Sequence, residues 1–222
     1  RGYLNRPAVK KHFSRKELQK LHGRTADPVA GLAPKFAMVG REVMDAHKKQ
    51  IKTLVIGRQK SGIVDLARYL TESYRIRAFA ALGKPSTAER YQQDVAALVQ
   101  DLGSGRGSFW AQKARPGNTR YQKQLDAEMI ELFNSEENLL GNVMPVLILN
   151  SSVYSTGVDL KDVGLVLLLD VPRTWSDYLQ QIGRSIRHCS HQRLRERGMD
   201  TQVQLKMLYN TFPATAEGPE KE

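Results

Sequence analysis

The sequence predicts an α/β fold in which helices cover both faces of a parallel sheet. Several short segments are apolar at every position instead of alternating, which is typical of strands that are buried on both faces. Segments with helical periodicity separate these strands, and this order favours a parallel sheet. In such a sheet, ligands gather at the loops that follow the carboxyl ends of the strands.

Each predicted element rests on its own pattern. The predicted strands are 53–57, 77–82, 145–150, 165–169 and 202–209. The predicted helices are 35–50, 62–73, a helix capped by residues 86–89, 121–134, and a helix that Thr174 caps. The last helix carries one apolar stripe, which consists of Trp175, Tyr178, Leu179, Ile182 and Ile186.

The chain divides into three predicted parts. Residues 1–33 form a basic helical segment and linker, with a short helix over 14–22, and residues 34–212 form the main domain. Residues 213–222 are a flexible tail. Residues 1–24 hold eight Lys and Arg against one acid, Glu17, which is +7 of the total net charge of +11.

Composition restricts the partners and the compartment. A net charge of +11 favours a polyanionic partner, nucleic acid first and an anionic membrane surface second. The longest apolar run, near 163–169, is too short to span a bilayer. Cys189 is the single cysteine, so no internal disulfide forms, and a cytoplasmic location is expected. Because the chain begins at Arg1, we expect it to be part of a longer polypeptide.

The residues with the clearest chemistry lie between 150 and 191. The loop 151–160 follows a buried strand, and a later helix contains the run from Gln180 to Arg187. Arg184 and Arg187 share one helical face, and arginine suits phosphate because its planar fork stays charged and bonds in two places. Gly183 inside this helix indicates the close approach of another backbone or of a ligand.

These motifs resemble the C-terminal half of superfamily-II helicases, in order and in spacing. Residues 52–57 resemble motif IV, 82–90 the following Gly/Glu-Arg element, 151–160 motif V, and 180–187 the Gln-x-x-Gly-Arg-x-x-Arg of motif VI. The resemblance covers roughly residues 34–210. It implies a second RecA-like domain that completes an ATP site on a first domain. That first domain would supply most of the contacts to ATP-bound Mg²⁺.

The resemblance implies a role for each matching residue. Arg187 would be an arginine finger at the γ-phosphate, with Arg184 assisting. The implied nucleotide-binding residues are Gln180, Gly183, Gly157 and Asp159. The expected nucleic-acid contacts are Ser151 and Arg58.

The Gly- and Arg-rich stretch 101–120 is predicted to be a long inserted loop. Arg106, Trp110 and Lys113 are candidate nucleic-acid contacts, because aromatic rings beside cations stack on bases. The alternative is a surface insertion whose aromatic side chains pack locally.

A finer resemblance is to the helicase-like nucleoside triphosphatases of large cytoplasmic DNA viruses, including the early transcription factor ATPases. It rests on residues 133–138, Gly141, the run 187–191 and Leu194. It implies a role in viral transcription, in the virion core or viral factory. Thr156 departs from the acid that these relatives often have, and the spacing between Arg90 and Phe133 is longer than theirs.

Two other sites are disfavoured. No phosphate-binding Gly-x-x-x-x-Gly-Lys-Ser/Thr loop is present; residues 83–86 lack its first glycine, and Pro85 breaks the turn. No metal site is predicted, because the run 188–191 fits no standard zinc spacing and is better explained as a helix-end cluster that contacts carbonyl groups.

The sequence therefore predicts the C-terminal motor domain of a nucleic-acid-dependent ATPase or helicase. By itself, this fragment is expected to be inactive. Two alternatives remain open: a RecA-like scaffold that has lost catalysis, and an NTPase or translocase of viral transcription that does not unwind.

Overall fold

The computed structural model describes residues 33–58, 62–86, 89–103, 111, 118–154, 158–183 and 189–209. The strands are β1 (Lys52–Gly57), β2 (Ala78–Ala81), β3 (Val146–Asn150), β4 (Val163–Leu168) and β5 (Gln204–Met207). The helices are α4 (Pro34–Lys48), α5 (Ile63–Tyr74), α6 (Glu89–Asp101), α8 (Thr119–Asn134), α9 (Trp175–Ile182) and α10 (Gln192–Glu196). The predicted helix 14–22 and the tail 213–222 lie outside the described residues.

The five strands form one parallel sheet in the order β2-β3-β1-β4-β5. The central strand β1 is buried at all six positions, and β3 at all five. Burial at every position is the reason why these strands read as continuous aliphatic runs instead of alternating ones. The predicted fold class is confirmed: the fold is α/β and consistent with a RecA-like domain.

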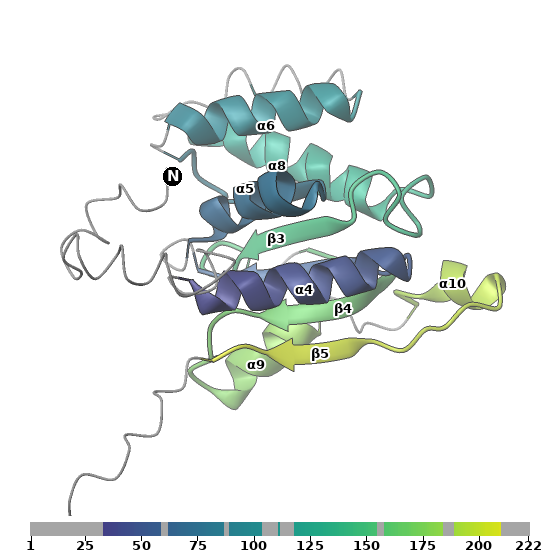
Figure 1. Ribbon diagram of the computed structural model, residues 1–222. Coiled ribbons are helices and arrows are strands. Elements are labelled where there is room, and N and C mark those ends of the chain that lie inside the picture. The colour runs from purple at the N-terminus through teal and green to yellow at the C-terminus, as the bar shows by residue number, and fades with distance from the viewer. Residues whose placement is uncertain are drawn as a thin grey trace, which may run out of the picture.

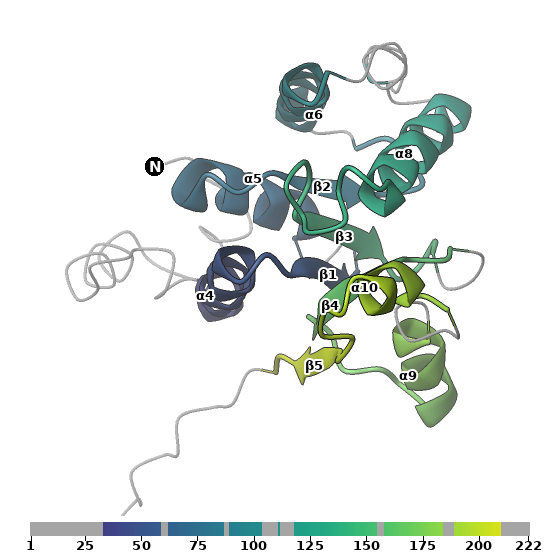
Figure 2. The same ribbon diagram turned by 90° about the vertical axis from the view of Figure 1, so that its right-hand side faces the viewer.

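Helices cover both faces of the sheet, as Figures 1 and 2 show. Helices α4 and α5 lie on one face, α8 and α9 lie on the other, and α6 lies beside the edge strand β2. The predicted apolar faces of α4 and α5 are buried. They include Phe36, Val39 and Val43 in α4, and Ile63, Leu66 and Leu70 in α5.

Helix α9 begins as predicted but packs less than predicted. The Thr174 hydroxyl accepts a hydrogen bond from the backbone N–H of Asp177 at 3.0 Å, which confirms the N-cap. Of the expected stripe, Tyr178 and Ile182 pack partly against the core. Trp175 remains 71% exposed and Leu179 46% exposed, so two of the four described residues of the stripe face outward, and Ile186 lies outside the described residues.

Two local expectations are corrected by the structure. Gly183 is not inside a helix: it is the C-cap of α9, and a Cβ added there would lie 2.9 Å from the carbonyl oxygen of Leu179 in the same helix. The stretch 101–120 is not entirely a surface loop, because Ala111 is helical and buried against the core. The rest of that loop, 104–110 and 112–117, lies outside the described residues.

Across the described part of the chain, every helix is too short or too polar to cross a membrane.

Candidate nucleic-acid and nucleotide interface

The carboxyl ends of four parallel strands meet at one edge of the sheet, and an open hollow of about 760 Å³ lies there. We call it the carboxyl-edge groove. It is lined by Arg58 after β1, Leu82 and Lys84 after β2, residues 150–153 at the end of β3, and Arg173, Asp177, Gln180 and Gln181 at and around α9. This is the place where parallel α/β sheets bind their ligands.

The groove brings together three of the residues that the sequence assigned to function. Arg58, Ser151 and Gln180 all line it, although they are up to 122 positions apart in the chain. Two cations that were not predicted, Lys84 and Arg173, line it as well. Among the described residues that line the groove, Asp177 is the one acid against three cations, so the groove carries an excess of positive charge.

Hydrogen bonds fix the loops that form the groove. The backbone N–H of Arg58 donates to Asp170 Oδ2 at 2.8 Å, which ties the loop after β1 to the loop after β4. Asn150 Nδ2 donates to the carbonyl oxygen of Leu82 at 3.1 Å, which ties the end of β3 to the loop after β2. The backbone N–H of Ser151 donates to Gly57 at 2.8 Å. The groove is therefore held in shape by contacts between neighbouring strand ends.

Comparison with known proteins finds a family that matches part of this fold. The family described as "Helicase conserved C-terminal domain" matches residues 113–189, about a third of the chain. The matched range contains α8, β3, β4 and α9, and with them the proposed motifs V and VI. This part of the chain is therefore similar to a helicase C-terminal domain.

A viral protein is similar to part of this chain. Nucleoside triphosphatase I of Melanoplus sanguinipes entomopoxvirus is 42% identical over 65 residues, which are 29% of this chain and 10% of that protein. The similar segment therefore spans about a tenth of the relative's length. The two levels of resemblance read from the sequence, to helicase C-terminal domains and to viral nucleoside triphosphatases, are both confirmed in this partial form.

Asp159 lies in a neighbouring hollow instead of the carboxyl-edge groove. That hollow, of about 670 Å³, lies between α8 and the chain from 153 to 161, and Val153 lines both hollows. The backbone oxygen of Asp159 accepts a hydrogen bond from Asn134 Nδ2 at 2.8 Å. The structure thus separates Asp159 from Gln180, another described residue that was expected at the nucleotide.

The remaining predicted residues of the helicase domain lie outside the described residues. These are Arg184 and Arg187 of motif VI, Gly157 of motif V, and Arg106, Trp110 and Lys113 of the insertion. Their roles stay predictions. Among the residues that the structure does describe, no cluster of three or more His, Cys, Asp or Glu side chains could hold a metal ion.

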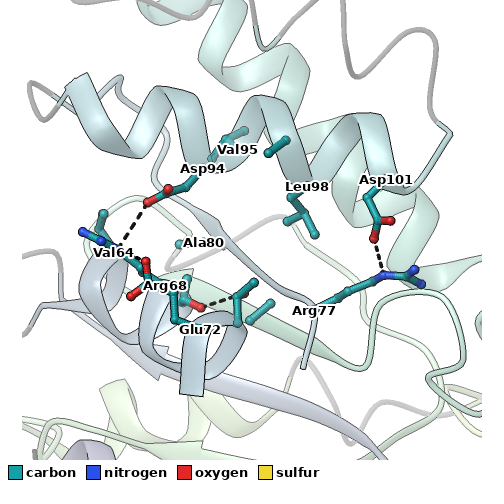
Figure 3. A pocket seen from close by; sticks show the side chains of 13 residues that line it. Val64, Arg68, Glu72, Arg77, Ala80, Asp94, Val95, Leu98 and Asp101 are labelled. Carbon is teal, nitrogen blue, oxygen red and sulfur yellow. Dashed lines mark hydrogen bonds and ion pairs between the residues drawn. The ribbon is translucent and has the colours of Figure 1, made fainter. Parts of the chain in front are cut away.

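A third hollow, of about 300 Å³, lies between α5, α6 and β2 and is drawn in Figure 3. Its charged rim is paired: Arg68 Nε lies 2.7 Å from Glu72 and 3.8 Å from Asp94, and Arg77 Nε lies 2.6 Å from Asp101. None of the described residues that line it was predicted to be functional.

A buried polar cluster lies at the opposite, amino edge of the sheet. Lys52, the first residue of β1, is 1% exposed; its Nζ donates to the Phe133 carbonyl oxygen at 2.5 Å and lies 4.3 Å from the Phe133 ring centroid. Beside it, Arg193 Nε donates to Asp162 at 2.8 Å. We call Lys52, Asn138, Asp162, His191 and Arg193 the amino-edge cluster.

This cluster explains the residues that carried the viral resemblance. His191 Nε2 lies 2.9 Å from the carbonyl oxygen of Val163, so it contacts a carbonyl group as expected, but one at the start of β4 instead of a helix end. Gly141 has φ +72°, and a Cβ there would lie 3.2 Å from Pro145 Cα. Arg193 also donates to the carbonyl oxygen of Asn134 at 2.8 Å. The described part of this resemblance therefore stabilises the fold and lies away from the groove.

Lys52 makes the stability of the fold depend on pH. Burial lowers its pKa from the usual 10.5 to about 7; the charge of Asp162 raises that pKa in part, and the charge of Arg193 lowers it further. Between these two values the unfolded chain binds more protons than the folded one, so the free energy of unfolding rises as the pH increases from about 7 to about 10.

Lys52→Met is expected to flatten this rise, because methionine fills similar space and does not titrate. The measurement is urea unfolding of the wild type and the variant across the alkaline range. An identical pH dependence in both proteins would show that Lys52 is not the responsible group.

Proposed function

We propose that this helicase domain is the second motor domain of a nucleic-acid-dependent ATPase, and that the carboxyl-edge groove binds the nucleic-acid backbone. The observation that carries the proposal is the convergence of Arg58, Lys84 and Arg173 beside Ser151 and Gln180 in one groove. Cationic and hydroxyl side chains at strand ends are the groups that bind phosphate oxygens. A polyanionic strand fits this lining better than a neutral small molecule does.

The nucleotide part of the proposal rests on motif VI. Helix α9 presents Gln180 to the groove and ends at Ile182 with Gly183 as its C-cap, and Arg184 and Arg187 follow in the sequence. In the proposed mechanism, ATP and Mg²⁺ are held mainly by a first RecA-like domain of the same polypeptide. Closure of the two domains brings Arg187 to the γ-phosphate, and hydrolysis releases them.

Salt dependence tests the nucleic-acid part. Binding through phosphates releases counterions, so the logarithm of affinity falls linearly with the logarithm of salt concentration. Lys84→Ala and Arg173→Ala are each expected to weaken binding of a labelled oligo(dT) strand and to lower that slope by about one unit. Arg195→Ala is the matched control, because Arg195 is exposed on α10 at the amino edge of the sheet. Affinity that does not change with salt, or equal losses in all three variants, would contradict the groove assignment.

A second candidate is an NTPase that moves on nucleic acid without separating strands. The similar viral protein bears the name nucleoside triphosphatase, which supports hydrolysis as the central activity. Because this relative is a viral protein, we also propose a role in viral transcription, within a virion core or viral factory. A duplex-unwinding assay on the full-length protein separates the two candidates: hydrolysis that nucleic acid stimulates, with no strand release, favours the second.

A further inference from the structure

We propose that Asp126 of α8 is the positioning residue of the carboxyl-edge groove, and that it acts by accepting hydrogen bonds from two of the loops that form it. The inference rests on the proposed function of the groove. It concerns a residue that neither lines the groove nor belongs to the motifs read from the sequence.

Asp126 joins the loops after β2 and β3 through a single oxygen atom. Its Oδ2 accepts a hydrogen bond from the backbone N–H of Gly83 at 2.6 Å and from the Tyr154 hydroxyl at 2.5 Å. Gly83 lies between Leu82 and Lys84, and Tyr154 directly follows the groove segment 150–153. The two donors are thus adjacent in sequence to the residues that line the groove on its β2 and β3 sides.

The two loops are packed without spare room at this point. Gly83 has φ +72°, and a Cβ added there would lie 2.2 Å from Val153 Cγ1, a distance that no side chain tolerates. Since Val153 also lines the groove, any displacement of Gly83 would move the groove wall with it. Because Asp126 accepts hydrogen bonds from both loops beside this contact, it fixes the distance between Lys84 and the 150–153 segment.

Burying a carboxyl group in this position costs free energy unless the group forms hydrogen bonds that an apolar side chain could not form. Asp126 is fully buried, and burial raises its pKa from 3.8 to about 6, although hydrogen bonds from Tyr154, Gly83, Gln122 and Leu82 lower that pKa in part. Tyr154 is the titratable group in contact with it; Gln122 and the Gly83 backbone, which also contact it, are neutral. Filling the space would need only a leucine, whereas two converging donors need an acceptor.

The neighbouring Gln122 shows how a neutral side chain could replace the carboxylate. Gln122 Nε2 donates to Asp126 Oδ1 at 2.7 Å, and its buried Oε1 has no hydrogen-bond partner among the described residues. If Asp126 became asparagine, the Gln122 amide could turn and its Oε1 would accept from the new Nδ2. The asparagine oxygen would still accept from Gly83 and Tyr154. Asp126→Asn therefore conserves the positioning contacts, and Asp126→Ala removes them.

The test compares the affinity of the 222-residue chain for labelled oligo(dT) at low salt in four variants. Asp126→Ala is expected to weaken binding about tenfold, and Asp126→Asn to stay within about twofold of the wild type. Tyr154→Phe, which removes one of the two donors, is expected to cost about threefold. Asp162→Asn is the matched control, a buried carboxyl at the amino edge; it should lower Tm and leave the affinity of the folded protein unchanged.

Stability against pH gives an independent readout of the same residue. Because its folded pKa lies above its unfolded value, Asp126 makes the free energy of unfolding fall as the pH rises from about 4 to about 6. Asp126→Asn should remove this fall while the groove still binds.

Each other outcome overturns the proposal. Equal losses of affinity in Asp126→Ala and Asp162→Asn would make the role merely structural, and a loss in Asp126→Asn as large as in Asp126→Ala would assign it to the charge. Wild-type affinity in both Asp126→Ala and Tyr154→Phe would end the positioning role while Lys84→Ala and Arg173→Ala still weakened binding. If those two variants also bound normally, the proposed function itself would fail. Should Asp126→Ala not fold, Tyr154→Phe alone decides.

Discussion

Replacing Arg187 with alanine is expected to lower the nucleic-acid-stimulated ATPase turnover of the full-length protein at least about a hundredfold, while ATP still binds. In phosphoryl transfer, negative charge spreads over the transferred phosphate, and a guanidinium placed there stabilises the transition state more than the bound substrate. Loss of such a group reduces kcat and leaves nucleotide affinity largely intact. The measurement is steady-state ATPase with and without single-stranded nucleic acid, together with ATP binding.

Two variants sharpen this prediction. Arg187→Lys should not restore turnover, because an ammonium group lacks the planar fork that meets two phosphate oxygens. Arg195→Ala, on the exposed side of α10, should leave turnover unchanged. If Arg187→Ala were silent, or if the parent protein hydrolysed no ATP, the domain would be a RecA-like scaffold and the motif VI assignments would be withdrawn.

The fold could be predicted from the sequence because its signal is local. Strands such as 146–150 are apolar at every position, and only burial on both faces of a sheet accounts for that pattern. The periodicity of α4 and α5 likewise identified the buried face correctly, since α4 and α5 pack on the sheet. For α9 the same signal identified an apolar stripe, but it did not show that Trp175 and Leu179 would remain exposed. Periodicity gives the direction of an apolar face and not which element packs against it.

The groove could be predicted only in part because the topology assembles it. Ser151 was found through a motif and Arg58 directly follows one, whereas Lys84, inside the 82–90 element, and Arg173 were given no role. They meet in the groove because four parallel strands end at one edge. One usable signal was missed: both lie within a few residues after a predicted strand. Asp126 gave no such signal, since one acid on an amphipathic helix reads as exposed.

For the amino-edge cluster, the sequence showed a family pattern but did not show the structural role of its residues. Lysine is rarely buried, so Lys52 at the start of a strand reads as a solvated flank. In the structure, Lys52 instead lies beneath the end of α8, where its Nζ donates to the Phe133 carbonyl oxygen, which also accepts from Asn138 Nδ2. The residues around 133–138 therefore provide hydrogen-bond partners for buried polar groups. Their contribution to the free energy of unfolding can be measured directly.

Asn138→Ala is expected to lower the free energy of unfolding by about 4 kcal/mol, since it would leave several buried backbone groups without partners. The Asn138 Nδ2 donates to the carbonyl oxygens of Phe133 and Met144, both at 3.0 Å. Its Oδ1 accepts from the backbone N–H groups of Val143 at 3.1 Å and Met144 at 2.8 Å. One fully buried side chain thus forms hydrogen bonds with four backbone groups on three residues.

Asn134 provides a matched control four residues earlier. It also bonds only backbone atoms, donating to the Asp159 carbonyl oxygen and accepting from the Lys161 N–H, both at 2.8 Å, but in a position that solvent reaches. Water can replace its contacts, so Asn134→Ala is expected to cost no more than about 1 kcal/mol. Urea unfolding of both variants gives the comparison. Equal losses would mean that burial of the Asn138 network does not set its energy, whereas the expected difference would assign the family-specific pattern at 133–138 to the stability of the loop that leads into β3.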